Sequence, residues 1–145
     1  MVKRLDVFTD GACSQFAASS GRGGWAAVAV FKGHVLSWKG AEESTTNNRM
    51  EMTAMLKVLE RLAKSPWKLD EVLIHSDSQY AIRMFDGTYK VKAKTANQDL
   101  IGRYRELEQS LGAKGTKVCF QWLRGHSGHV HNEMADQLAQ GMLYG

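Results

Sequence analysis

The stretch Leu5-Asp6-Val7-Phe8-Thr9-Asp10-Gly11-Ala12-Cys13 decides the fold that we expect for this chain. Its leucine, valine and phenylalanine predict a strand that is apolar on both faces, and such strands lie inside sheets that helices cover. Asp10 stands near the end of this strand, where a buried carboxylate is costly unless a proton, a donor or a metal ion compensates its charge. The alternative is an ordinary turn, because Asp-Gly after a strand is a common hairpin signal.

The composition is that of a soluble protein. We expect the 145 residues to form one domain, 1–145, with its own hydrophobic core. No apolar run is long enough for a transmembrane helix, and the first strand begins too early for a signal peptide. Cys13 and Cys119 lie too far apart to form a metal-type pair, so we expect a reducing, cytoplasmic setting. We also expect a monomer with no membrane contact, and the net charge of +4 fits a polyanionic partner.

Two further strands are predicted at residues 25–31 and 34–40, after a small and polar connection at 14–24. The connection ends in Gly21-Arg22-Gly23-Gly24, and no helix follows it, which argues against a dinucleotide-binding loop. We expect a flexible turn whose backbone approaches a ligand closely. Lys32-Gly33 predicts a tight turn, so the three strands should form an antiparallel meander.

A helix is predicted to begin in the N-capping cluster Thr45-Thr46-Asn47-Asn48 and to continue to about Lys64, where Ser65-Pro66 ends it. Its apolar stripe consists of Met55, Val58, Leu59 and Leu62. Counting back four residues from Met55 places Glu51 at the head of this stripe, facing inward. The alternative is that Glu51 pairs with Asn48 in an exposed capping box.

A second apolar strand at residues 71–76 follows this helix, so we expect it to run parallel to the first strand. Asp77 stands at its carboxyl end, where open α/β sheets place their ligand sites. Asp77 alternatively caps a helix predicted from Ser78 to about Phe85. If the two strands are adjacent, their ends bring Asp10 and Asp77 close together.

The pattern breaks at residues 86–96, which carry Lys90, Lys92 and Lys94 at alternate positions. In an extended segment this spacing places the three lysines on one side, while the alternative is a solvated loop without a partner. Asn97 is predicted to cap the next helix, and a last strand should follow at 116–123. The helical stripe is formed by Leu100, Tyr104, Leu107 and Leu111.

The segment Arg124-Gly125-His126-Ser127-Gly128-His129 is unlike a structural connection. His126 lies close to two glycines, and a histidine side chain suits proton transfer. A histidine metal site with His129 and His131 is the alternative, although no cysteine is near to complete a structural zinc site. The final helix is predicted to start near Asn132 and to carry Asp136 in its second turn.

Four acids stand at positions where a charge needs a partner, and all four are predicted to lie at one edge of the sheet: Asp10, Glu51, Asp77 and Asp136. Four clustered carboxylates do not stay ionised together without cations. Oxygen ligands in this number suit Mg²⁺ or Mn²⁺ rather than zinc. Two such ions, about 3.5–4 Å apart, form the usual clamp for in-line attack on a phosphodiester.

Four segments, at residues 9–11, 46–51, 76–80 and 125–136, resemble type 1 ribonuclease H in order, spacing and context. They read Thr-Asp-Gly, Thr-Asn-Asn-Arg-Met-Glu, Ser-Asp-Ser-Gln-Tyr, and Gly-His followed by Asn-Glu and Asp136. The resemblance spans nearly the whole chain. It implies an α/β ribonuclease H-like fold, in which a five-stranded mixed sheet combines a three-strand antiparallel meander with parallel strands and is flanked by helices.

The resemblance also implies an activity and a site. The family hydrolyses the RNA strand of RNA–DNA hybrids and leaves 5′-phosphate and 3′-hydroxyl ends. By resemblance, the four acids would bind two Mg²⁺ ions, or Mn²⁺, and His126 would shuttle a proton or help to release product. Thr46 and Asn97 match positions that hold a DNA-strand phosphate. Positions that touch the hybrid's minor groove, where 2′-hydroxyls distinguish RNA from DNA, are matched by Gly11, Cys13, Asn47, Asn48 and Gln79.

Two departures from the family pattern concern substrate binding. Many bacterial members carry a basic, aromatic-rich protrusion before the helix that starts here at Asn97, whereas this chain has only residues 86–96. Members without the protrusion often have an N-terminal hybrid-binding domain, for which we expect no room here. The turn at 14–20 also lacks the usual Asn-Pro-Gly pattern.

Two other functions stay open. The first is a hybrid-binding module without catalysis. The second is an integrase or resolvase core, and residues 46–51 and the histidine loop argue against it.

Overall fold

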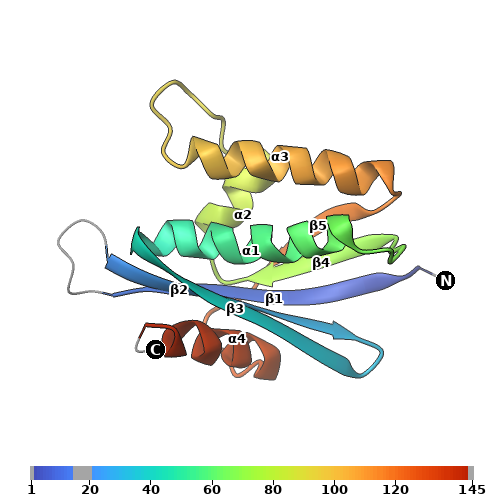
Figure 1. Ribbon diagram of the computed structural model, residues 1–145, viewed down its shortest axis with the longest axis horizontal. Helices are drawn as coiled ribbons and strands as arrows, with labels where there is room; N and C mark the ends of the chain where they lie inside the picture. Colours follow the sequence, from blue (N-terminus) through green and yellow to red (C-terminus); the bar gives the residue numbers. More distant parts are fainter. Residues whose placement is uncertain (1, 15–20, 144–145) are drawn as a thin grey trace.

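The computed structural model describes residues 2–14 and 21–143. Over these residues, five strands form one mixed sheet in the order β3-β2-β1-β4-β5. Helices α1, α2 and α3 cover one face of the sheet and α4 covers the other (Figure 1). The elements are β1 (Arg4–Cys13), β2 (Gly21–Phe31), β3 (His34–Thr45), α1 (Asn47–Lys64), β4 (Glu71–Ser76), α2 (Gln79–Asp86), α3 (Gln98–Ala113), β5 (Lys117–Trp122) and α4 (Val130–Gly141). The expected fold class is confirmed.

The strand pairing confirms both the meander and the crossover. β2 pairs antiparallel with β1 and with β3, through a turn in which Lys32 and Gly33 have φ values of 49° and 82°. β4 lies parallel to β1, with Val7 opposite Ile74, and β5 is parallel to β4. β1 is therefore the central strand, and its carboxyl end lies beside that of β4.

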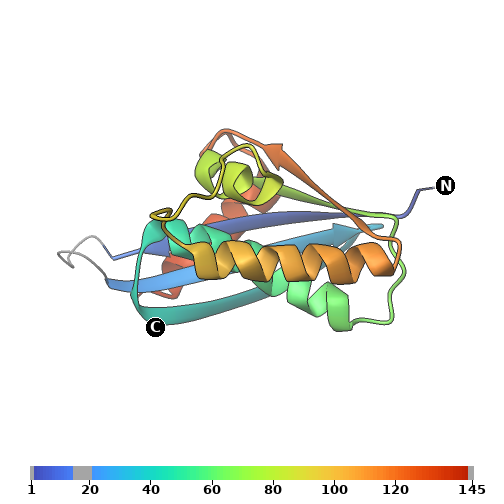
Figure 2. The same ribbon diagram turned by 90° about the horizontal axis from the view of Figure 1, so that it is seen from above.

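Helix α1 packs its apolar stripe on this sheet and brings its amino end over β1 (Figure 2). The Thr46 hydroxyl caps it by accepting a hydrogen bond from the Arg49 amide at 3.2 Å. Glu51 is only 4% exposed, as the stripe predicted, so the alternative of an exposed capping box with Asn48 is wrong. The helix ends at Lys64, directly before Ser65-Pro66.

The expectation of a glycine turn at residues 21–24 is wrong, because these residues form the first part of β2. A side chain at Gly23 would come within 2.6 Å of Met50 Cγ in α1, and one at Gly24 would meet the Ala139 carbonyl in α4. The glycines are therefore required by the close packing of a helix on each face of the sheet. Residues 15–20 of the expected connection lie outside the described residues.

Two element boundaries also differ from those expected. β3 extends five residues beyond Gly40, because Ala41, Glu42 and Thr45 continue the pairing with β2. Helix α4 starts at Val130, before the expected Asn132. None of the helices in the described ranges is both long and apolar enough to cross a bilayer.

Candidate active site

Three of the four expected acids meet at the carboxyl ends of β1 and β4. Oxygen atoms of Asp10, Glu51 and Asp77 all lie within 4.8 Å of one another. Among residues 2–14 and 21–143, no other group of three His, Cys, Asp or Glu side chains is this compact. Asp10 and Glu51 are buried, with 5% and 4% of their surface exposed, and Asp77 is half-buried. Such a set of oxygen donors fits a divalent cation.

Gly11 places Glu51 beside Asp10. A Cβ atom at Gly11 would lie 2.5 Å from the Met50 carbonyl carbon and 2.8 Å from Met50 Cβ, so glycine alone lets α1 approach β1 this closely. The Gly11 amide donates to Asp10 Oδ1 at 2.9 Å and also to Glu51 Oε1. Gly11, expected only as a groove contact, therefore also builds the carboxylate site.

Asp77 is held from the β5 side of the site. Trp122 Nε1 in β5 donates to the Asp77 carbonyl at 3.2 Å. A Cβ atom at Gly125 would lie 2.7 Å from Asp77 Oδ2, so only glycine fits there without a shift. The sequence analysis considered Gly125 only as a neighbour of His126, so the contact with Asp77 was not predicted. A glycine between the last strand and the histidine loop is the feature of the sequence that could have indicated such a close contact.

The carboxylates retain protons more strongly than ordinary acids. Burial raises the pKa of Asp10 from its ordinary 3.8 to about 7, and the negative charge of Asp77 contributes to this. Burial, together with the hydrogen bond to Asp10, raises the pKa of Glu51 well above its usual range. The pKa of Asp77 is also raised, again mainly by burial and further by the charge of Asp136. Because these pKa values are raised, binding of a divalent cation to the carboxylates would be coupled to the release of protons.

Asp136 and His126 lie at the border of this carboxylate group. Asp136, half-buried in α4, is outside the compact set of three, but its carboxyl raises the pKa of both Asp10 and Asp77. The positive charge of His126 acts in the opposite direction on the pKa of Asp77. His126 is exposed and has a φ of 56°.

The alternative of a histidine metal site receives no support from the described residues. The rings of His129 and His131 pack on Phe8, with centroids 4.6 Å and 5.5 Å away. Neither belongs to a compact group of ligands with His126.

The residues expected in the substrate groove lie in β1 and at the amino ends of α1 and α2, in the elements that carry Asp10 and Glu51 or shortly after Asp77. Thr46, Asn47 and Asn48 are exposed at the amino end of α1, and Gln79 is exposed at the amino end of α2. Gly11 and Cys13 are half-buried in β1, where the Cys13 thiol donates to the Thr45 carbonyl at 3.4 Å.

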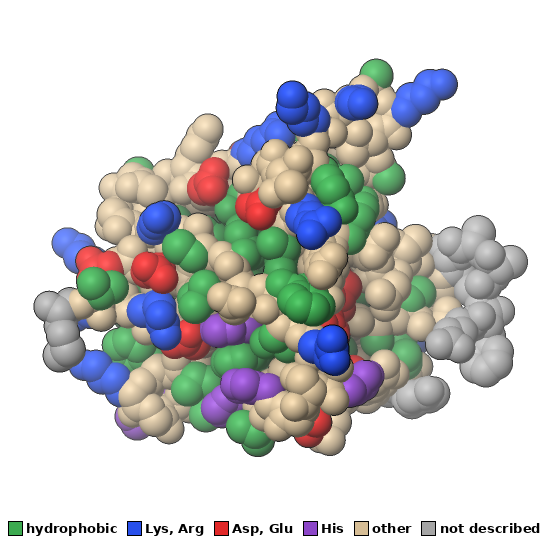
Figure 3. Space-filling view, turned by 180° about the vertical axis from the view of Figure 1, so that it is seen from behind, with side chains coloured by type: hydrophobic (Ala, Val, Ile, Leu, Met, Phe, Trp, Pro, Cys, Tyr) green, Lys and Arg blue, Asp and Glu red, His purple; other side chains and the backbone are tan. Residues whose placement is uncertain are grey.

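Asn97 and the lysine loop differ from the expectation. Asn97 directly precedes α3, but its side chain does not cap the helix; it bonds to Tyr80 and Arg49 instead. The loop at 86–96 projects from the body of the protein with Lys and Arg side chains gathered over it (Figure 3). Lys90, Lys92 and Lys94 are exposed, but the Thr95 amide bonds to the Lys92 carbonyl at 3.1 Å and closes a turn around Lys94. The prediction of one extended row of three lysines is therefore wrong.

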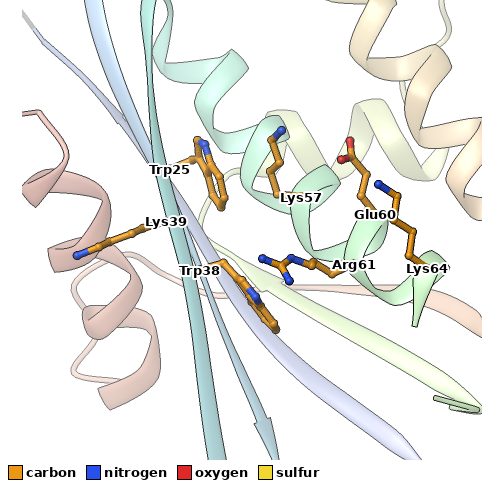
Figure 4. Close-up of a pocket in the computed structure, with 7 residues that line it drawn as sticks. All are labelled: Trp25, Trp38, Lys39, Lys57, Glu60, Arg61 and Lys64. Carbon is orange, nitrogen blue, oxygen red and sulfur yellow. The ribbon is translucent and has the colours of Figure 1, made fainter. Parts of the chain in front are cut away.

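A hollow between β3 and α1 is lined by none of the four acids Asp10, Glu51, Asp77 and Asp136 (Figure 4). It is lined by Trp25, Trp38, Lys39, Lys57, Glu60, Arg61 and Lys64. The Trp25 ring lies over Gly40, where a Cβ atom would come within 2.6 Å of the indole nitrogen. This hollow is therefore separate from the carboxylate site.

Fold and site together fit a metal-dependent hydrolase, because three carboxylates cluster where the parallel strands β1 and β4 end and helix α1 approaches them. A family model described as RNase H matches residues 2–143. A Ribonuclease H of Chelativorans sp. (strain BNC1) is 39% identical, over 96% of this chain and 85% of that protein. A Ribonuclease H of Rhodospirillum rubrum is 40% identical, over 94% of this chain and 81% of that protein. The crystal structure of LC11-RNase H1 in complex with RNA/DNA hybrid has a similar fold, with a TM-score of 0.79, 21% identity, and coverage of 97% of this chain and 96% of that one. The chain belongs to the ribonuclease H family.

Proposed function

We propose that this protein hydrolyses the RNA strand of RNA–DNA hybrids at the group formed by Asp10, Glu51 and Asp77, leaving 5′-phosphate and 3′-hydroxyl ends. The observation that carries the proposal is the compact set of three carboxylates whose pKa values are raised, mainly by burial. The similarity to proteins named Ribonuclease H and to a hybrid-bound RNase H1 structure supports the substrate class.

The residues fit divalent cations, and we assign Mg²⁺, or Mn²⁺ in its place, to this site. Asp10, Glu51, Asp77 and Asp136 would hold two ions, because hard oxygen donors are the ligands that these ions prefer. Bound ions would supply charge stabilisation for in-line attack on the phosphodiester. The raised pKa values of Asp10 and Glu51 imply that ion binding and proton release are coupled.

We assign proton transfer to His126. Its exposed ring lies near enough to Asp77 to affect the carboxylate's pKa. An imidazole nitrogen accepts and returns a proton near neutral pH without a change of conformation elsewhere. In our proposal His126 shuttles a proton or helps to release product, and the four acids would hold the ions.

Hybrid binding is assigned to the surface around the carboxylates. Asn47, Asn48 and Gln79 carry amides, which both donate to and accept from 2′-hydroxyls, and Gly11 and Cys13 contribute backbone and thiol atoms beside them. Thr46 and Asn97 would hold a DNA-strand phosphate at the amino ends of α1 and α3, where the helix dipoles favour an anion. The exposed Lys90, Lys92 and Lys94 would add phosphate contacts from the loop.

The expected cellular setting belongs to the same proposal. Cys13 and Cys119 are free thiols, which suits a reducing, cytoplasmic compartment. We also propose that the protein is active as a monomer. Sedimentation of the active protein with hybrid tests this directly.

A cleavage assay with matched substrates tests the function. Labelled RNA–DNA hybrid, RNA duplex and DNA duplex of one sequence are incubated with Mg²⁺ or Mn²⁺. We expect cleavage of RNA in the hybrid only, and loss of cleavage in Glu51→Gln with hybrid binding retained. Glu60→Gln, which changes an acid of the same helix outside the site, is the matched control. Binding without cleavage by the wild type would favour the inactive module, and cleavage of the DNA duplex would favour an integrase-like core.

A further inference from the structure

The side chain of Asn97 is held by residues of two other helices. Asn97 Nδ2 donates to the Tyr80 hydroxyl at 2.9 Å, and Arg49 Nη1 donates to Asn97 Oδ1 at 3.2 Å. Arg49 belongs to α1, Tyr80 to α2, and Asn97 precedes α3. The backbone of Asn97 is left-handed, with a φ of 64°, a conformation that asparagine tolerates better than most residues. Three helices thus meet at one half-buried amide.

These two contacts determine which way the amide faces. An arginine has donors only, so the amide oxygen of Asn97 must face Arg49. The amide nitrogen then faces Tyr80, whose hydroxyl accepts one of its two N–H groups. The second N–H of Asn97 has no acceptor among the described residues, and a phosphate oxygen can serve because it only accepts.

Arg49 is itself held in place by Asp99, which also balances its charge. Its two terminal nitrogens donate to Asp99 Oδ1 and Oδ2 at 3.0 Å and 2.7 Å. This bidentate pair fixes the plane of the guanidinium group. Because Asp99 offsets its charge, Arg49 is better suited to orient Asn97 than to attract a phosphate directly.

We propose that Arg49 and Tyr80 are positioning residues, which hold the Asn97 amide so that its remaining N–H meets a DNA-strand phosphate of the hybrid. This inference rests on the proposed function, in which Asn97 contacts such a phosphate. The competing explanation is structural: the same bonds tie α1, α2 and α3 together and have no effect on the substrate. In the structural explanation, loss of these hydrogen bonds lowers the stability of the fold. In our proposal, their loss misorients the Asn97 amide and weakens recognition of one particular phosphate.

Hybrids with single neutral phosphates separate the two explanations. Methylphosphonate replaces one DNA-strand phosphate at a time, and KM and kcat are measured with Mg²⁺ for the full chain. We expect one sensitive position in the wild type, and no such sensitivity in Asn97→Gly, in which glycine accepts the left-handed backbone. Tyr80→Phe and Arg49→Lys each remove a hydrogen bond to the amide, and Arg49→Lys retains the charge.

We expect both variants to raise KM on unmodified hybrid by about threefold to tenfold, the usual effect of one hydrogen bond, with kcat within about twofold. On hybrid with methylphosphonate at the sensitive position, the variants and the wild type should have similar KM values. Tyr104→Phe, which removes a hydrogen bond to Glu108 within α3, is the matched control and should keep the sensitivity of the wild type. Urea unfolding of each variant shows the effect on stability separately.

The outcomes separate this inference from the proposed function. If Asn97→Gly keeps the sensitivity of the wild type at every position, Asn97 makes no phosphate contact, and the assignment and the inference both fail. If Asn97→Gly abolishes it but Tyr80→Phe and Arg49→Lys keep it, the inference alone is refuted. An equal rise in KM on all hybrids in these variants also refutes it, because the bonds are then purely structural.

Discussion

Replacing Asp10 with asparagine should stabilise the metal-free protein at neutral and alkaline pH. The folded pKa of Asp10 is raised to about 7, whereas its ordinary value is 3.8. Between these two values the folded state binds more protons than the unfolded state, so the stability of the wild type falls as pH rises through this window. An asparagine side chain cannot ionise, so the stability of the variant should not fall in this way.

The magnitude follows from the same two values. Each pH unit between them corresponds to about 1.4 kcal/mol, which sets an upper bound of about 4 kcal/mol on the effect above pH 7. Glu51 and Asp77 have raised pKa values of their own and share the cost of ionisation with Asp10. We therefore expect the variant to gain about 2–3 kcal/mol in unfolding free energy at alkaline pH and little at about pH 4.

Urea unfolding in the presence of a chelator, from about pH 4 to pH 9, measures this difference. Asp6→Asn is the matched control, because Asp6 lies on the same strand outside the carboxylate group and pairs with Arg4 and His75. Added Mg²⁺ should reduce the difference in unfolding free energy between Asp10→Asn and the wild type, because a cation that binds only the folded wild type stabilises it. A metal-free Asp10→Asn protein that is less stable than the wild type at about pH 9, or a difference independent of pH, would refute the reasoning.

Four further predictions concern the site and its surroundings. Gly11→Ala should push α1 away from β1 and cost about 1–3 kcal/mol of unfolding free energy along with most activity; wild-type cleavage in this variant would contradict the contact with Met50. Gly125→Ala should weaken divalent-ion binding in calorimetry, because its Cβ would collide with Asp77, and unchanged affinity would show that the loop yields freely. His126→Ala should slow turnover roughly 10²-fold without weakening metal binding, and equal rates from about pH 6 to 9 would remove His126 from the mechanism. Changing Lys90, Lys92 and Lys94 to Gln should raise KM and flatten its salt dependence, by roughly 0.7–0.9 in the log–log slope for each phosphate that the loop no longer binds, with kcat little changed; identical salt dependence would leave the loop without a role.

The sequence by itself determined most elements of this protein and the three acids of its carboxylate group. Apolar runs, the capping cluster before α1 and Ser65-Pro66 are local signals, so strands and helices could be predicted within a few residues. Glu51 was found because a charged residue at the head of an apolar stripe is itself a local anomaly. Asp10 and Asp77 followed from the rule that adjacent parallel strands end at the same edge.

Only the tertiary structure decided features that depend on contacts between distant residues. Gly23 and Gly24 belong to a strand because they pair with β1 and β3, and they are glycines because helices α1 and α4, both distant in sequence, pack on the two faces of that strand. Asparagine is a common helix-capping residue, but the Asn97 side chain bonds to Arg49 and Tyr80 and not to its own helix α3. Gly125 is required by Asp77, which lies 48 positions earlier in the chain. A residue's chemistry is local, whereas the space and partners around it arise only when the whole sheet and its helices have packed.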